Sequence, residues 1–501
     1  MGLVMFMSLL TLSMLLYLCL ILRRVRGFSG HGPPNYPIIG CLVSFYKNQH
    51  RLLDWYTDLL AESTTQTIVV HRLGAPRTIV TANPSNIEYI LKTNFDNFPK
   101  GKPFAEILGD FLGSGIFSVD GELWQAQRKL ASHEFSTKSL QEFVLKTMKD
   151  EVEERLLPLL ESLAGKENVA VDLQELLRRL AFDMVCRVSL GFDPCCLDRE
   201  NPSPPGWFPL ARAFDTASQI CARRGAAPIF VIWKIKRWIG IGSERELKKA
   251  IGEVHEFVGR IIEKRKEKAE GSSTGQDDLL GRLVCAGHEE EVIRDMVISF
   301  IMAGRDTTSA AMTWLFWLLS HHPDIEQEVV EEVRSGMGDR ELVTYESLKE
   351  MRLLKACLCE TMRLYPPVAW DSKYADGDDL LPDSTPVRKG DRVTYFPYGM
   401  ARMEGLWGKD RFRFKPDRWF DEPSRERRTL KQVCPYKFPV FQAGPRMCLG
   451  KEMAFVQMKY VVASVLRRFS LRPVGVGGPP AFVPLLTAHM AGGFKVVVCR
   501  R

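Results

Sequence analysis

A ten-residue stretch near the carboxyl end combines one cysteine with residues that can shape a flat binding surface. It spans residues 441–450 and reads Phe-Gln-Ala-Gly-Pro-Arg-Met-Cys-Leu-Gly. Gly444 and Gly450 permit backbone conformations that other residues avoid, so the loop can lie flat and present the sulfur of Cys448. An apolar segment that we expect to be helical begins at Lys451. The unpaired amides and the positive dipole end at its start favour a thiolate over a thiol.

We interpret Cys448 as the ligand of a haem iron. A thiolate on haem iron favours cleavage of the O–O bond, which neutral histidine ligation supports much less well. Arg446 could pair with a haem propionate, and Phe441 could shield the sulfur from water. The alternative is a buried structural cysteine beside a glycine-rich turn. The fit of ten residues at fixed spacing argues against that alternative.

A second polar cluster lies inside an apolar segment, residues 291–322, which contains no proline and little glycine. Its apolar residues nearly encircle the predicted helix, which would be about 45 Å long. The stretch Ala-Gly-Arg-Asp-Thr-Thr at 303–308 interrupts it, and buried polar groups are costly without partners. Gly304 leaves room for a small molecule, and Asp306 and Thr307 could deliver protons to bound dioxygen. The alternative is a threonine hydroxyl that bonds its own helix.

The spacing at Phe441, Gly444, Arg446, Cys448 and Gly450 resembles the haem-binding signature of the cytochrome P-450 family of monooxygenases. The resemblance covers the chain from residue 32 onward, and the 303–308 stretch is similar to the family's oxygen-activating motif. It implies haem b, ligated by the cysteine, and dioxygen as co-substrate. It also implies electrons from NADPH, delivered by a membrane flavoprotein reductase.

Trp124 and Arg128 stand four residues apart and therefore on one face of a helix. This spacing resembles the family's W-x-x-x-R, which implies that both side chains contact the haem propionates. Without the cysteine motif, the same pair would be an ordinary buried tryptophan and a surface arginine.

Glu360 and Arg363 are three residues apart and meet on one helix face. With Arg418 they resemble the family's Glu-Arg-Arg network, which we assign to folding rather than catalysis. The family form after the preceding proline is Glu-Arg-Phe, so Asp417 and Trp419 are mild departures.

Apolar residues in several stretches are candidates for the substrate pocket. Residues 104–117 are apolar but interrupted by three glycines, which we interpret as a lid loop, too flexible for a core helix. The resemblance places this loop, the long helix, the extended chain after Pro367 and a segment near 485 around the substrate. The candidates are Phe104, Ile107, Leu108, Phe111, Leu112, Phe117, Ala303, Val368, Ala369, Leu485 and Leu486. Core packing is the alternative for each of them. Asp371, Lys373 or an arginine elsewhere could hold a polar head group of the substrate.

The amino terminus predicts a membrane anchor. Residues 3–22 carry no charge and are long enough to span a bilayer, and three arginines follow by residue 26. The positive-inside rule then places the remainder in the cytosol. A cleaved signal peptide is the alternative, but its apolar core would be shorter and its start basic. We expect a single-pass anchor at 1–24, a basic and proline-rich hinge at 25–40 similar to that of microsomal family members, and a haem-thiolate monooxygenase domain at 41–501 in the endoplasmic reticulum membrane.

Composition and pattern indicate one large domain. The 501 residues are 45% hydrophobic and include no linker or repeat long enough to divide them. Two runs rich in β-branched residues, 67–72 and 77–81, predict a hairpin, whereas most later segments have helical patterns. We therefore predict a mainly α fold with a minor β sheet, consistent with the cytochrome P-450 fold.

The net charge of +7 is modest for a chain of this length. It argues against a dedicated nucleic-acid binder and fits the docking of an acidic partner or a membrane surface. Arg128, Lys129, Lys437 and Lys451 form a candidate docking patch for the reductase, although each alone could be a solvated charge.

Within the family, residues 303–308, 370–373 and 442–446 resemble the plant ω-hydroxylase branch, including jasmonoyl-isoleucine hydroxylases and fatty-acid ω-hydroxylases. That resemblance implies hydroxylation of the terminal carbon of a lipophilic aliphatic substrate. Two alternatives remain open. One is a haem-thiolate hydroperoxide isomerase or dehydratase that needs no reductase, and the other is a non-enzymatic membrane protein that binds haem or lipid.

Overall fold

The computed structural model describes residues 32–136, 138–166, 169–197, 207–271, 278–337, 344–421, 429–475 and 478–501. The predicted anchor at 1–24 and the first part of the predicted hinge lie outside these residues. Across the described ranges, no helix has both the length and the apolar character needed to cross a membrane. Residues 32–40 form turns closed by a bridge between Tyr36 and Gly40.

Helices dominate the described chain. They are α2 (Leu42–Asn48), α3 (Leu52–Glu62), α4 (Pro84–Glu88), α5 (Gly101–Leu112), α6 (Gly121–Ser136), α7 (Lys138–Asp150), α8 (Leu157–Ala164), α9 (Leu173–Leu190), α10 (Trp207–Gly225), α11 (Phe230–Ile239), α12 (Ser243–Gly271), α13 (Leu279–Cys285), α14 (Glu290–Ser320), α15 (Pro323–Met337), α16 (Tyr345–Glu350), α17 (Arg352–Leu364), α18 (Pro397–Met400), α19 (Glu404–Trp407) and α20 (Lys451–Arg468). Short turns of tighter or wider helix include η2 (Tyr89–Thr93), η5 (Pro416–Trp419), η6 (Pro439–Phe441) and η7 (Gly444–Arg446).

The strands form small sheets. They are β1 (Thr67–Val70), β2 (Thr78–Thr81), β3 (Ala170–Asp172), β4 (Asp371–Tyr374), β5 (Asp379–Leu380), β6 (Pro386–Val387), β7 (Arg392–Tyr395), β8 (Phe469–Pro473), β9 (Phe482–Val483), β10 (His489–Met490) and β11 (Lys495–Arg500). The antiparallel pair β1 and β2 confirms the predicted hairpin. The largest sheet has the order β1-β2-β7-β4, and its β4–β7 register sets Asp371 opposite Tyr395. A mainly α fold with minor sheets is therefore confirmed.

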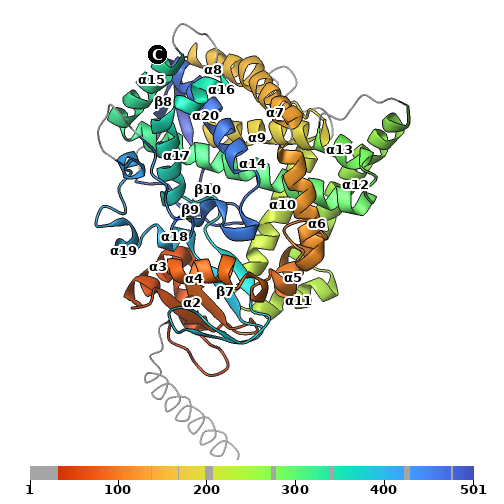
Figure 1. Ribbon diagram of the computed structural model, residues 1–501, viewed down its shortest axis with the longest axis vertical. Helices are drawn as coiled ribbons and strands as arrows, with labels where there is room; N and C mark the ends of the chain where they lie inside the picture. Colours follow the sequence, from red (N-terminus) through yellow and green to blue (C-terminus); the bar gives the residue numbers. More distant parts are fainter. Residues whose placement is uncertain are drawn as a thin grey trace, which may run out of the picture.

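The long helix α14 forms the axis of the structure. It runs across the middle of the molecule, while the sheet that contains β7 lies at the lower end beside α2, α3 and α4 (Figure 1). Its 31 residues confirm the predicted long helix, and apolar side chains such as Met296, Trp314 and Leu318 are buried along it. The helix α9 packs along α14, and α17 and α20 also contact it. Because α14 is packed against other helices, Arg305 and Thr308 at its centre are buried, and Asp306 and Thr307 are partly buried.

The predicted lid loop at 104–117 is wrong for its first part, because residues 101–112 form the helix α5. Its buried residues follow a helical period, and their burial outweighs the flexibility of Gly109. The carboxylate of Asp120 accepts the N–H groups of Lys100 and Gly101 at 2.9 Å each, which satisfies the start of the helix. The chain leaves the helix at Gly113, whose φ of 53° suits glycine.

Candidate active site

The cysteine loop is the first element of the site. Cys448 donates its backbone N–H to the carbonyl of Phe441 at 2.8 Å, which closes the loop just before α20. Gly444 has a φ of 66°, and a side chain there would collide with the carbonyl oxygen of Leu91 in η2. Glycine is therefore required at this position by both backbone conformation and space.

Two opposing effects act on the pKa of Cys448. The residue as a whole is exposed, yet the protein around its thiol is dense enough that desolvation raises the pKa above the usual value. The N–H of Gly450 and the charges of Arg128 and Lys451 lower the pKa, as the helix end was expected to do, but burial has the larger effect. The helix end therefore acts on the pKa in the predicted direction, and desolvation opposes it. Ligation by a metal ion would remove the proton.

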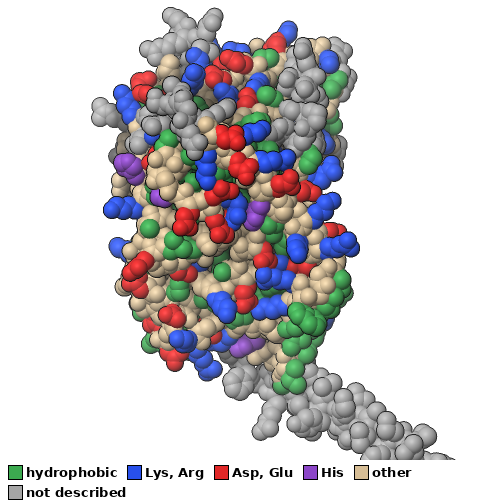
Figure 2. Space-filling view, turned by 90° about the vertical axis from the view of Figure 1, so that its right-hand side faces the viewer, with side chains coloured by type: hydrophobic (Ala, Val, Ile, Leu, Met, Phe, Trp, Pro, Cys, Tyr) green, Lys and Arg blue, Asp and Glu red, His purple; other side chains and the backbone are tan. Residues whose placement is uncertain are grey.

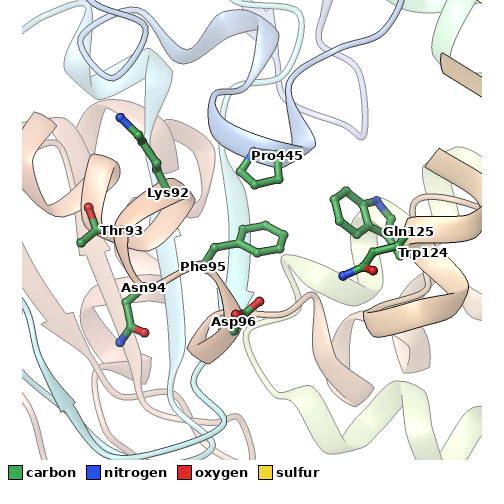
Figure 3. Close-up of a pocket in the computed structure, with 8 residues that line it drawn as sticks. All are labelled: Lys92, Thr93, Asn94, Phe95, Asp96, Trp124, Gln125 and Pro445. Atoms are coloured by element: carbon green, nitrogen blue, oxygen red, sulfur yellow. The ribbon is translucent and has the colours of Figure 1, made fainter. Parts of the chain in front are cut away.

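The basic and aromatic residues predicted beside the cofactor gather around this loop. On α6, Trp124 lies under the guanidinium of Arg446, which is 4.4 Å from the ring centroid. Arg128, one turn further along α6, donates to the carbonyl of Met447. The indole of Trp124 and the ring of Pro445 both line one pocket (Figure 3). Arg446 also donates to Val119 and pairs with Asp120 at 2.6 Å, contacts that the sequence did not indicate.

The donors around the loop fit a ligand that carries carboxylates. Among the described residues, Lys373 Nζ and Arg446 Nε are buried without a hydrogen-bond partner. The side chain of Lys373 is 0% exposed, and burial followed by the charge of Lys100 lowers its pKa well below the usual value. Burial without an acceptor favours the uncharged amine of Lys373, so an anionic ligand would stabilise its ammonium form. Together with the sulfur of Cys448, this donor set fits haem and its propionates.

The structure places Thr307 and Asp306 in the middle of α14. Thr307 Oγ1 donates to the carbonyl of Ala303 at 2.7 Å, the local bond that the sequence left open as an alternative. Gly304 faces α9, where a Cβ atom would lie 2.9 Å from Val185 Cγ2. The glycine therefore permits close packing of the two helices, and the prediction that it leaves room for a small molecule is wrong.

Two arginines flank Asp306, and the sequence did not predict either role. Asp306 Oδ1 lies 3.6 Å from the Nε atoms of both Arg178 and Arg305, and no hydrogen bond reaches it from the described residues. Both arginines are bound instead by Asp215 on α10, at 2.6 and 2.8 Å. These residues come from three different helices, so no sequence spacing could have joined them.

The candidate pocket residues divide by burial. Ile107, Leu108, Phe111 and Leu112 are buried in one hydrophobic core cluster, and Ala369 is buried in another. These five are buried, as the alternative of core packing expects. The remaining candidates keep part of their surface accessible and can line a pocket: Phe104, Phe117, Ala303, Val368, Leu485 and Leu486.

The proposed head-group residue Asp371 is already occupied. Its carboxylate accepts from Lys100 Nζ at 2.6 Å, from Gln442 Nε2 at 2.7 Å and from the backbone N–H of Ser372 at 2.8 Å, and the Tyr395 hydroxyl lies 2.8 Å from it. Because these donors surround it, Asp371 cannot hold a substrate head group as predicted.

Glu360, Arg363 and Arg418 come together in a buried network. Glu360 accepts two bonds from Arg363 and one from Arg418, each at 2.8 Å. The backbone N–H of Lys415 and the indole of Trp419 add further bonds at 3.1 and 3.0 Å. The departure at Trp419 therefore adds a donor to Glu360 that a phenylalanine could not supply.

A family model for cytochrome P450 matches residues 31–490. The chain is a cytochrome P450. It is 58% identical to cytochrome P450 94B1 of Arabidopsis thaliana over 486 residues, which are 95% of this chain and 93% of that protein. It is also 57% identical to cytochrome P450 94B3 of the same plant, covering 96% of this chain and 94% of that protein. Cytochrome P450 94A2 of Vicia sativa is 45% identical, with coverage of 94% and 91%.

These matches confirm the predicted family and the predicted class of enzyme, a haem-thiolate monooxygenase. In such a P450, haem with a cysteine ligand activates dioxygen, and a redox partner supplies the electrons. The substrate is a small molecule. The protein residues hold the cofactor, exclude or admit water, and manage protons around it.

Proposed function

We propose that this P450 hydroxylates the terminal (ω) carbon of a lipophilic aliphatic substrate, either jasmonoyl-isoleucine or a fatty acid. The electrons come from NADPH through a membrane flavoprotein reductase. The reaction consumes the substrate, O2, NADPH and one proton, and yields the alcohol, water and NADP+. Two features support the regiochemistry: the ω-hydroxylase-like stretches at 303–308, 370–373 and 442–446, and the high identity to plant P450s numbered 94.

In this proposal, Cys448 Sγ is the iron ligand, and Phe441, Gly444 and Gly450 shape its loop. The Phe441 ring packs 5.2 Å from that of Phe455 and so covers one flank of the loop with apolar surface. Such a surface limits access of water to the sulfur.

The propionate-binding residues are Trp124, Arg128 and Arg446. The unpartnered donors at Arg446 Nε and Lys373 Nζ support this assignment, because each is buried and lacks an acceptor among the described residues. Guanidinium and indole N–H groups match carboxylate oxygens in charge and geometry.

The acid–alcohol pair on α14 is the observation that carries the monooxygenase proposal. Thr307 donates its proton to Ala303, so its Oγ1 lone pairs remain available to accept a hydrogen bond from water or from an oxygen ligand. Asp306 Oδ1 is buried and receives no hydrogen bond from the described residues, so it can accept one from a water molecule that enters the site. The pair can pass protons inward during oxygen activation, a step that an isomerase does not need.

The pocket residues with accessible surface are all apolar, which supports a lipophilic substrate. Phe104, Phe117 and Leu486 belong to one packed cluster beside α14, so aliphatic chains would contact carbon on several sides. A hydroxylation site at the chain end requires that these walls hold the chain lengthwise.

The membrane assignment rests on the predicted anchor and on a hydrophobic surface. On α11, Trp238 is 87% exposed, and Ile235 and Ile239 are also exposed. Ile38, close to the beginning of the described chain, is exposed as well. Hydrophobic side chains gather at the lower end of the molecule (Figure 2). An exposed aromatic and aliphatic surface fits contact with lipid, and it supports the proposal that the catalytic domain lies on the cytosolic face of the endoplasmic reticulum membrane.

The four basic residues proposed to dock the reductase differ in their contacts. Lys437 Nζ lies 4.6 Å from the ring centroid of Trp407, and Lys451 Nζ lies 6.0 Å from that of Phe441. Arg128 is bound to the cysteine loop, whereas Lys129 is exposed. Lys129 is therefore the best placed of the four to attract an acidic partner.

The decisive experiment uses the full-length protein in membranes with and without the reductase. We expect NADPH-dependent oxygen uptake and ω-hydroxylated products from jasmonoyl-isoleucine or from fatty acids, and the comparison of specificity constants identifies the substrate. Conversion of hydroperoxides without reductase would instead establish an isomerase. The Cys448→Ala variant should lose both turnover and the red-shifted absorbance of the reduced carbon monoxide complex. Substrate binding that persists as the only function after this change would support a binding protein.

A further inference from the structure

The residue that opens the cysteine loop has an unusual backbone conformation. Gln442 has a φ of 63° and a ψ of −178°, a region that non-glycine residues rarely adopt. It directly follows Phe441, whose carbonyl closes the loop onto Cys448. Such a conformation persists only where the surrounding structure holds it in place. Whatever holds Gln442 in this conformation therefore also helps to fix the position of the Cys448 sulfur.

The side chain of Gln442 supplies this restraint. Its Oε1 accepts from the Tyr395 hydroxyl, and its Nε2 donates to Asp371 Oδ2 at 2.7 Å. The Tyr395 hydroxyl lies 2.8 Å from the same carboxylate oxygen. Since a hydroxyl has a single proton to donate and a carboxylate only accepts, the amide of Gln442 must direct its nitrogen toward Asp371. Both polar atoms of the Gln442 side chain are thus fixed.

The anchor for Gln442 is rigid and charged. Asp371 and Tyr395 are direct neighbours across the β4–β7 register. Burial would raise the pKa of Asp371, but Lys100, bonded at 2.6 Å, and then Lys373 together lower it, so the group is ionised at neutral pH. The backbone N–H of Ser372 adds another bond at 2.8 Å. A sheet-borne carboxylate with this many donors has little freedom to move.

We propose that Asp371 and Tyr395 form a clamp on the Gln442 side chain that sets the position of the Cys448 sulfur relative to the haem. The proposal rests on the function proposed for Cys448. Asp371, Tyr395 and Gln442 are positioning residues, because they act on the iron ligand through the loop backbone. The clamp joins two stretches 71 residues apart, 370–373 and 442–446, that both carry the ω-hydroxylase resemblance.

The test uses variants that remove the side-chain hydrogen bonds of position 442 without adding strain to its backbone. Gln442→Gly removes the side-chain bonds but suits the backbone conformation, so it should fold. Gln442→Glu keeps the shape but sets a second carboxylate against Asp371. Tyr395→Phe loses one hydroxyl. Tyr398→Phe is the matched control, since it removes a tyrosine hydroxyl that lies 2.8 Å from an aspartate, Asp54, but does not reach the loop.

The readouts are haem content per protein and the fraction of the reduced carbon monoxide complex with the red-shifted band. Loss of a hydrogen bond to a charged group shifts an equilibrium by about tenfold, so we expect a comparable fall in the ratio of thiolate-ligated to other haem. The fall should occur in the Gln442 variants and in Tyr395→Phe, with Tyr398→Phe unchanged.

A rescue variant makes the test specific. In the double variant Asp371→Asn with Gln442→Glu, the amide and the carboxylate exchange places, so the bond between positions 371 and 442 re-forms with reversed polarity and conserved charge. We expect the red-shifted fraction to recover above that of Gln442→Glu. A Gln442→Gly protein with the parent spectrum and haem content would overturn the clamp. If Cys448→Ala retained the red-shifted band, the proposed ligand itself would be wrong, so the two failures are distinguishable.

Discussion

Replacing Glu360 with glutamine tests whether the buried network stabilises the fold. Glu360 is 0% exposed and accepts five hydrogen bonds, three at Oε1 and two at Oε2. In Glu360→Gln, the amide oxygen can keep the three bonds, but the NH2 group faces the donors Arg363 Nε and Trp419 Nε1. The substitution also leaves the Arg363 guanidinium, which is 1% exposed, without its counter-charge.

The loss of unfolding free energy expected for Glu360→Gln follows from the burial of the ion pair. Removing one partner of a buried ion pair costs about 3–5 kcal/mol, because the other charge stays buried and uncompensated. We expect the cost of Glu360→Gln to be near the lower end of this range, because the amide oxygen keeps the three hydrogen bonds that Oε1 accepts in the parent protein. Trp419→Phe removes one donor and leaves all charges paired, so it should cost about 1.5 kcal/mol.

The assay is urea unfolding, monitored by far-ultraviolet circular dichroism. The urea midpoints of the variants are compared, provided that the dependence of the unfolding free energy on urea concentration is the same. Glu404→Gln is the matched control, because Glu404 also binds an arginine, Arg411, at 2.8 Å but is 53% exposed in its side chain. An exposed pair contributes less than about 1 kcal/mol. If Glu360→Gln shifts the midpoint no more than Glu404→Gln does, the assignment of the network to fold stability is wrong.

Three further outcomes are expected. Thr307→Ala should uncouple turnover, with peroxide released in place of product, and the ratio of peroxide to NADPH consumed measures it; unchanged coupling would remove Thr307 from the proton relay. Burial and then the charge of Glu151 raise the pKa of Asp183 to about 7. The contribution of protonated Asp183 to the free energy of unfolding is therefore complete below pH 3.8, the ordinary pKa, and is lost as the pH rises through about 7. Urea midpoints should therefore fall over this interval and fall less in Asp183→Asn; equal slopes would exclude the role of Asp183. Lipid contact should shield position 238 on α11 from water-soluble thiol reagents. In full-length protein in membranes, the thiol introduced by Trp238→Cys should therefore react several-fold more slowly than the thiol introduced by Phe412→Cys, because Phe412 is 63% exposed and lies outside α11. Equal reaction rates would contradict lipid contact at α11.

The cysteine loop and the long helix could be predicted because both depend on local sequence. Gly444 adopts a conformation that only glycine tolerates well, and this requirement is visible in the chain itself. The apolar pattern of 291–322 fixed the existence and nearly the limits of α14, since a helix hydrophobic on most sides must be buried.

The pattern at 104–117 shows where local reasoning is insufficient. Three glycines indicated a loop, but burial of residues such as Phe111 and the acceptor at Asp120 stabilise the helix α5. The conformational cost of one glycine inside a helix is about 1 kcal/mol, which the burial of several large side chains exceeds.

By itself the sequence determined the family, the iron ligand to be tested, the acid–alcohol pair and the Glu-Arg-Arg network, because each is a set of residue types at short or characteristic spacing. Tertiary structure alone decided the partners of those residues. It alone showed that Asp215 binds the arginines beside Asp306, that Asp371 restrains Gln442, and that burial raises the pKa of Cys448. Hydrogen bonds and desolvation depend on distances between segments that are remote in the chain, and the folded backbone sets those distances.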